Sequence, residues 1–191
     1  DILLSALALI LLSWLFLILC IAIKIDSRGP ILFKQKRVGI HKTHFMIYKF
    51  RTMRIDTPKD MPTHMLADPE QYITRVGKFL RKSSLDELPQ IFDILRGDMS
   101  FVGPRPALPN QTRLLELRHE NGSDQLKPGL FGLAQKNGRD QLLETEKAAY
   151  DGEYAEKLSF WMDCKSFFGC IFNSVLQKNI VEGKQSHSTK K

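Results

Sequence analysis

The sequence predicts an α+β protein that is mainly helical and is attached to a membrane by an N-terminal helix. Three observations support this fold class. Ile2–Ile23 is a 22-residue apolar stretch without a charged residue, two β-like segments follow it, and helical patterns prevail in the remainder. The 191 residues include 28 basic and 21 acidic side chains, for a net charge of +7, which favours anionic lipid or phosphate ligands.

The apolar stretch Ile2–Ile23 is long enough to span a bilayer as a helix at about 1.5 Å per residue. The segment Lys24–Arg54 that follows holds nine Lys or Arg residues against one acid, Asp26. Such a basic flank lies on the cytoplasmic side of a membrane and faces anionic lipid. We therefore predict a membrane helix at 1–23, a membrane-associated cytoplasmic domain at 24–182 and a polar tail at 183–191.

Ile31–Val38 and His44–Phe50 alternate in the manner of strands, and a short turn segment separates them. They predict a small β-hairpin that directs Lys49 toward the functional site. Near the C-terminus, a stripe of large apolar side chains follows a helical period: Tyr154, Leu158, Trp161, Phe168 and Phe172. This stripe fits either core packing or an amphipathic interfacial helix on the bilayer surface, with partial membrane contact.

Two adjacent carboxylates, Asp86 and Glu87, are the best candidates for chemistry. One interpretation is structural, because Ser84 and Glu87 match a capping box at the start of a helix. Pro89 favours a later start with Asp86 as the N-cap, where the missing N–H of proline does no harm. Both interpretations place the acids at the positive end of a helix, which also attracts phosphate.

The surroundings of the two acids are basic and rich in turns. Arg81 precedes them, and Arg105 follows between two prolines that hold it in place. Fixed guanidinium groups suit bidentate contacts to phosphate, although surface charge is the simpler interpretation of each arginine alone. A second turn-rich block, Lys127–Gly132, fits a surface hairpin or another basic loop.

The remaining motifs are uninformative. Cys20, Cys164 and Cys170 have no zinc-site spacing and suggest no disulfide framework. The scattered histidines form no His-Glu-x-x-His arrangement, and the sequence contains no P-loop or dinucleotide fingerprint. Nucleic acid is not an expected partner, because the basic residues adjoin an apolar membrane segment and no nucleic-acid-binding motif occurs.

Four motifs in order resemble the bacterial sugar transferase family, the monotopic phosphoglycosyl transferases. They are Lys49–Met53, Arg81–Gln90, Gly97–Pro106 and Lys127–Gln135, and the resemblance extends from the N-terminus to about residue 176. It implies transfer of a sugar-1-phosphate from a UDP-sugar to a polyprenyl phosphate, undecaprenyl phosphate in bacteria. The nucleotide leaves as UMP, and Mg²⁺ is the implied cofactor.

The resemblance also implies roles for individual residues. Asp86 is the expected nucleophile, which forms a covalent phosphosugar intermediate in a ping-pong reaction, and the expected magnesium ligand. Glu87 is required, but its role is open. Matched by position, Lys49, Arg81 and Arg105 are the cations that neutralise the pyrophosphate, with Arg105 the foremost candidate for phosphate contact.

In this family the membrane helix is re-entrant, because a Ser-Pro break makes it enter and leave on one face. The chain has Ser13-Trp14 at that place, so a re-entrant helix must bend without proline, and a spanning helix is the alternative. The chain begins at Asp1, which leads us to expect residues upstream.

Two other functions remain open: a non-catalytic module that binds anionic lipid, and a glycosyltransferase that releases UDP. The sequence gives no physical basis for the choice of sugar, and an N-acetylated UDP-sugar is the default expectation. A product of this reaction would begin the assembly of a bacterial glycoconjugate.

Overall fold

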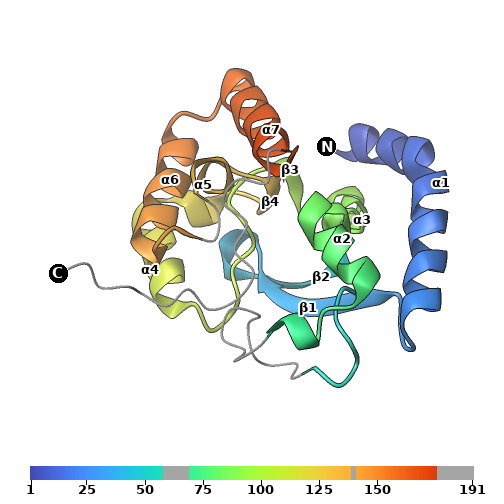
Figure 1. The fold of residues 1–191 in the computed structure, drawn as a ribbon. Helices are drawn as coiled ribbons and strands as arrows, with labels where there is room; N and C mark the ends of the chain where they lie inside the picture. Colours follow the sequence, from blue (N-terminus) through green and yellow to red (C-terminus); the bar gives the residue numbers. More distant parts are fainter. Residues whose placement is uncertain (58–68, 139–140, 176–191) are drawn as a thin grey trace.

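The computed structural model describes residues 1–57, 69–138 and 141–175, and Figure 1 shows their arrangement. The predicted polar tail at 183–191 lies outside the described residues. The fold is α+β and mainly helical, as predicted. In chain order the elements are α1 (Ile2–Asp26), β1 (Leu32–Val38), η1 (Ile40–Lys42), β2 (His44–Phe50), η3 (Pro69–Gln71), α2 (Arg75–Ser83), η4 (Leu85–Glu87), α3 (Gln90–Arg96), β3 (Ser100–Val102), α4 (Thr112–Glu120), η5 (Ser123–Gln125), β4 (Gly129–Phe131), α5 (Leu133–Asn137), α6 (Glu144–Glu156) and α7 (Phe160–Val175).

Helix α1 is long and apolar enough to cross a membrane, by length and composition. Figure 1 shows that it changes direction: its first half runs along the top of the view, and its second half descends along the right-hand side. Near the middle of its sequence, the Ser13 hydroxyl donates to the Ile10 carbonyl oxygen at 2.8 Å. A hydroxyl that bonds back to the preceding turn favours bending of a helix.

The predicted β-hairpin is confirmed. Strands β1 and β2 pair antiparallel, with Leu32 opposite Phe50 and Val38 opposite His44. The connecting turn includes His41 and Lys42 with φ of 53° and 58°, which reverses the chain within five residues. Strand β2 delivers Lys49 to the centre of the domain.

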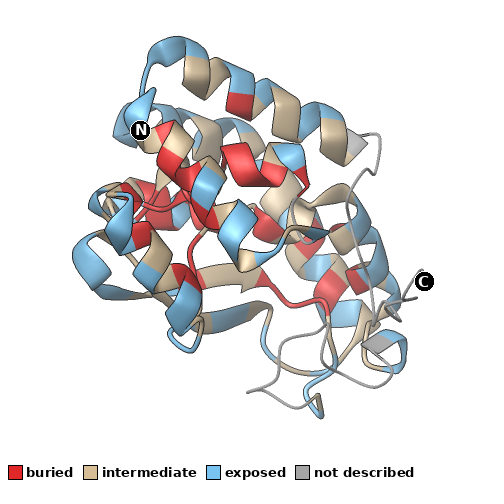
Figure 2. Ribbon diagram, turned by 90° about the vertical axis from the view of Figure 1, so that its left-hand side faces the viewer, coloured by how far each residue is buried: buried red, intermediate tan, exposed pale blue. Residues whose placement is uncertain are grey.

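The second half of α1 is part of the domain core. Leu19 and Ile23 pack with Phe50 from β2 and Leu80 from α2 in one buried cluster. The ring of Phe16 lies 5.5 Å from that of Phe50, between centroids. Figure 2 shows that buried residues occupy the centre of the domain, whereas the outer faces of the helices are exposed. The membrane helix and the hairpin therefore form one packed unit.

The block Lys127–Gly132 is not a hairpin, so that interpretation was wrong. Its strand β4 pairs parallel with β3, with Ser100 opposite Gly129. A Cβ on Gly129 would overlap the backbone of Gly103, so the two chains approach closely only because both residues lack side chains. The partner strand lies far upstream, and the local turn signals could not reveal it.

The C-terminal apolar stripe belongs to two helices. Helix α6 ends at Glu156 and α7 begins at Phe160. Tyr154 is buried, and its hydroxyl lies 2.6 Å from an Asp163 carboxylate oxygen across the break. Most aromatic side chains of α7 are exposed, with Trp161 at 79 % and Phe168 at 65 %, whereas Phe167 packs on Phe131 with ring centroids 4.8 Å apart. Tyr154 thus belongs to the core, and the remainder of the stripe faces outward.

Candidate active site

The two acids lie in a short 3-10 turn between α2 and α3. Helix α2 ends at Ser84, which has a left-handed backbone with φ of 56°, and Leu85–Glu87 form η4. The hydroxyl groups of Ser84 and Ser174 lie 3.0 Å apart, so α7 contacts the start of this turn. The acids are therefore on a compact turn that two helices hold in place.

The predicted helix start was placed too early. Pro89, not Asp86, occupies the N-cap position of α3, and the Ser84 side chain makes no capping bond. Proline lacks an N–H and fits this first position, so the reasoning from Pro89 had the right direction. The Glu87 carboxylate, which a capping box requires, is engaged by cations instead.

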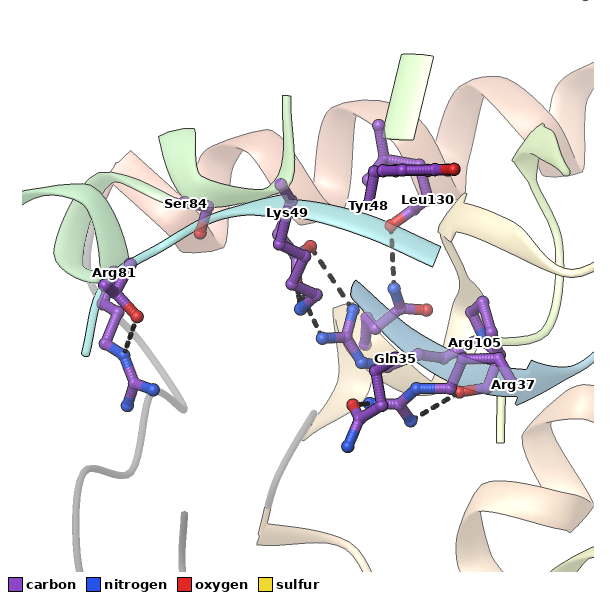
Figure 3. Close-up of polar contacts among 12 residues, drawn as sticks. Gln35, Arg37, Tyr48, Lys49, Arg81, Ser84, Arg105 and Leu130 are labelled. Carbon is purple, nitrogen blue, oxygen red and sulfur yellow. Dashed lines mark hydrogen bonds and ion pairs between the residues drawn. The ribbon is translucent and has the colours of Figure 1, made fainter. Parts of the chain in front are cut away.

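Glu87 joins two of the predicted cations. Its Oε1 lies 2.7 Å from Lys49 Nζ and 2.6 Å from Arg105 Nη2, while its Oε2 lies 3.4 Å from Arg105 Nη1. Glu87 is buried, with 7 % of its surface exposed. Figure 3 shows Lys49 and Arg105 near one another, although they come from β2 and from the loop after β3. Burial lowers the pKa of the Lys49 ammonium, and the adjacent Glu87 carboxylate opposes this shift.

Asp86 occupies the same turn but is only half-buried. Its negative charge supports the protonated form of Lys49, so the two side chains share one electrostatic environment. Glu87 is therefore buried in an ion-pair cluster, whereas the neighbouring Asp86 keeps part of its surface exposed.

Arg81 lies on the other side of Lys49 from Arg105 in Figure 3. Its Nε donates to the Thr52 hydroxyl at 2.9 Å. Thr52 is two residues beyond the end of β2, the strand that carries Lys49. Helix α2 packs against Thr52 so closely that a Cβ on Gly77 would overlap the Thr52 carbonyl oxygen. In this view Lys49 lies between the other two predicted cations, Arg81 and Arg105.

Mg²⁺ fits this site as an ion shared between a carboxylate and the phosphates of the substrate, not as an ion enclosed by protein ligands. Within the three described ranges, no group of three or more His, Cys, Asp or Glu side chains could hold a metal ion. Mg²⁺ is commonly bound by one or two carboxylates together with substrate phosphates and water. A half-buried Asp86 carboxylate meets that requirement.

Sequence reasoning missed two residues that support the site. Arg37 was grouped with the lipid-facing basic flank, but it donates to the Pro106 carbonyl oxygen at 3.0 Å, and burial lowers its pKa to about 10. Asp93 is fully buried, and its Oδ2 accepts from the Tyr48 backbone N–H at 3.0 Å. Their partners lie 69 and 45 residues away, so no local signal could have identified them.

A family model described as bacterial sugar transferase matches residues 1–177. The undecaprenyl-phosphate glucose phosphotransferase of Komagataeibacter xylinus is 36% identical over 189 residues, which covers 94% of this chain and 36% of the relative. The UDP-glucose:undecaprenyl-phosphate glucose-1-phosphate transferase of Klebsiella pneumoniae is 39% identical over 191 residues, which covers 94% and 40%. An uncharacterized sugar transferase of Bacillus subtilis is 42% identical over 155 residues, or 79% and 72%. The chain thus spans less than half the length of the first two relatives.

Proposed function

Since the chain belongs to the bacterial sugar transferase family, we propose that it transfers a sugar-1-phosphate from a UDP-sugar to undecaprenyl phosphate and releases UMP. One observation carries this proposal: the half-buried Asp86 interacts electrostatically with Lys49, which belongs to the cluster of Lys49, Glu87 and Arg105. A carboxylate next to fixed cations suits attack on a phosphate that would otherwise repel it.

The reaction has two transfers. An oxygen of Asp86 attacks the sugar-bearing phosphorus, the bond to the bridging oxygen of the diphosphate breaks, and UMP leaves with that oxygen. The phosphate oxygen of the polyprenyl chain then attacks the same phosphorus and restores the carboxylate. Because the first product leaves before the acceptor reacts, the kinetics are ping-pong.

Lys49, Arg81 and Arg105 neutralise the diphosphate during these steps. Arg105 has the rigid fork that suits bidentate phosphate contact, and Lys49 acts as a point charge. We assign Glu87 a positioning role, because its two oxygens already hold both cations at 2.6 to 3.4 Å. Asp86 is the residue that would hold Mg²⁺, which supplies further neutralisation of the phosphate oxygens when bound.

The names of the relatives favour glucose as the sugar over the default expectation of an N-acetylated sugar. The lipid-linked product would begin assembly of an O-antigen, capsule, exopolysaccharide or glycoprotein glycan. Membrane lipid is part of the working environment, and nucleic acid is not a proposed partner.

The two ends of α1 support a re-entrant membrane helix. The Asp1 carboxylate accepts from the Ser100 hydroxyl at 2.9 Å, and Figure 1 places the N-terminus beside β3. At the other end, Asp26 Oδ2 accepts from the Val76 backbone N–H at 3.0 Å. A straight spanning helix would put its ends on opposite sides of a bilayer about 30 Å thick. We therefore propose that both ends lie on the cytoplasmic face of the inner membrane, so single cysteines at Leu3 and Ile25 should both be labelled from that side.

The deciding experiment measures nucleotide release from a panel of UDP-sugars by the membrane-embedded protein with Mg²⁺ and undecaprenyl phosphate. We expect UMP from UDP-glucose, and a loss of at least about 1,000-fold in Asp86→Asn, because the amide is no nucleophile. The variant should bind membranes like the wild type. Release of UDP would identify a conventional glycosyltransferase, and full activity of Asp86→Asn would contradict the covalent mechanism. No release from wild type with any sugar would favour the lipid-binding module.

A further inference from the structure

The loop that carries Arg105 is held by two arginines from other elements, the half-buried Arg37 and the buried Arg118. Arg37 of β1 donates to the carbonyl oxygen of Pro106. Arg118 of α4 donates its Nη1 to the carbonyl oxygen of Arg105 itself, also at 3.0 Å. Two consecutive backbone carbonyls are therefore fixed from different directions, and the Arg105 side chain leaves the backbone at a defined place.

Arg118 is oriented by a buried ion pair. Its Nε and Nη2 both donate to one carboxylate oxygen of Asp151 on α6, at 2.9 and 2.6 Å. Arg118 is 7 % exposed and Asp151 is 1 % exposed. An ion pair buried this deeply is weak evidence for stability, because apolar residues of the same volume often serve the fold as well. Its geometry is therefore informative about another role.

The contacts of the planar Arg118 guanidinium indicate that role. Two N–H groups on one edge are fixed by Asp151, so the plane and rotation of the group are set, and the remaining Nη1 is aimed at the Arg105 carbonyl. The contacts then continue through Arg105 to Glu87 and from Glu87 to Lys49. One path of charge-assisted bonds connects α6 and α4 to the candidate active site.

We propose that Arg118 and Asp151 are positioning residues for the transfer reaction, which hold Arg105 where its guanidinium meets the phosphate groups of the donor. This inference rests on the proposed function, since it assigns a supporting pair to the same site. Displacement of a binding group by about 1 Å can cost up to about 100-fold in rate, so a fixed backbone anchor has a measurable effect.

The test compares three variants for UMP release, with kcat and KM determined separately. Arg118→Lys keeps the charge beside Asp151 but cannot make all three contacts, and Asp151→Asn weakens the orientation of Arg118. We expect each to lower kcat/KM by about 10- to 100-fold. Asn121→Ala is the matched control, because the Asn121 side chain also connects to α6, through the Ala148 carbonyl oxygen at 2.7 Å, but does not belong to the path that leads to Arg105. It should retain the kinetics of the wild type.

A double-mutant cycle separates positioning from general destabilisation. In an Arg105→Ala background, Arg118→Lys should cause little further loss, because the group that it positions is gone. An equal loss in both backgrounds would overturn the proposal, as would a loss in Arg118→Lys no greater than in Asn121→Ala. If the wild type releases no UMP, the proposed function fails first.

A second replacement covers the case in which the single variants do not fold. Arg118→Met combined with Asp151→Leu fills the same space with apolar side chains, which often preserves stability. We expect a folded protein with kcat/KM reduced by about 10- to 100-fold. A folded double variant with wild-type kinetics would overturn the positioning role.

Discussion

The outer helices expose large apolar side chains, whereas the interior buries charged side chains beside its apolar clusters. On α1 and α7, large apolar side chains are exposed, with Leu3 at 88 % and Trp161 at 79 %. In the interior, carboxylates are buried: Glu87 is 7 % exposed and Asp151 is 1 % exposed. Exposed apolar surface of this kind is explained by contact with lipid, and buried charge requires paired partners. Under the proposed function, the exposed apolar surface serves attachment to the membrane and the buried charges serve phosphate chemistry.

The largest effect on activity is expected when the charge of the buried Glu87 is removed. Glu87→Gln leaves Lys49 and Arg105 adjacent to one another without the carboxylate between them. We expect kcat/KM for UMP release to fall by about 100- to 1,000-fold, the range found when one stabilising group is lost from an active site. Glu153→Gln is the control, since Glu153 forms an exposed pair with Lys157. Equal activity of the two variants would show that the buried cluster is not catalytic.

The next prediction concerns the stability that depends on Asp93, a buried carboxylate outside the ion-pair cluster. Burial raises the pKa of Asp93 to about 6, although the hydrogen bond from the Tyr48 N–H and the charge of Arg96 both act to lower it. The folded protein therefore holds this proton more tightly than the unfolded chain, and stability decreases as pH rises from about 4 through 6. Asp93→Asn should remove up to about 3 kcal/mol of this pH dependence. Thermal unfolding in detergent between pH 4 and 7 measures it.

The control for Asp93 is Asp56→Asn, because Asp56 belongs to an exposed ion pair with Arg54. This variant should keep the pH dependence of the wild type. If Asp93→Asn also keeps it, then Asp93 is ionised in the folded protein throughout this range, and the buried carboxylate must have a stronger partner than the Tyr48 backbone.

The smallest effect is expected on the outer side. In Trp14→Phe, Trp161 is the single tryptophan, and brominated lipids should quench its fluorescence if α7 lies on the bilayer. Trp161→Ser should lower activity in vesicles by no more than about threefold, because α1 provides most of the apolar contact. Leu143→Ser is the control, since Leu143 is 67 % exposed at the start of α6. Full quenching of Trp161 by a water-soluble quencher would place α7 away from lipid.

Local signals were sufficient for much of the fold and for part of the site. The hairpin followed from alternating residues around a turn, and its strands begin and end within one residue of the prediction. The adjacent acids and the proline-flanked Arg105 were visible because each motif is a few residues long. The structure brings Glu87, Lys49 and Arg105 together as a cluster, which the motifs alone could not establish.

The remaining features depend on contacts that are distant in sequence. Arg118 and Asp151 are 33 residues apart, and the bond from Arg37 to Pro106 spans 69. The C-terminal stripe misled for another reason. The spacing of Tyr154 and Trp161 fits a helical period, and the break after Glu156 happens to preserve it. Periodicity in sequence cannot distinguish one helix from two, and here Tyr154 faces the core whereas Trp161 faces outward.

The contact of Gly103 with Gly129 has an evolutionary consequence. Neither glycine has room for a side chain, because the backbone of the other lies too close. A substitution at one of the two positions therefore cannot be compensated by a substitution at the other. The 25 residues between the two glycines therefore leave and return to the same place in the fold, the contact of Gly103 with Gly129. A change of length within this excursion therefore has to keep both of its ends in place. It also has to keep α4 in place, because Arg118 of α4 bonds the Arg105 carbonyl oxygen.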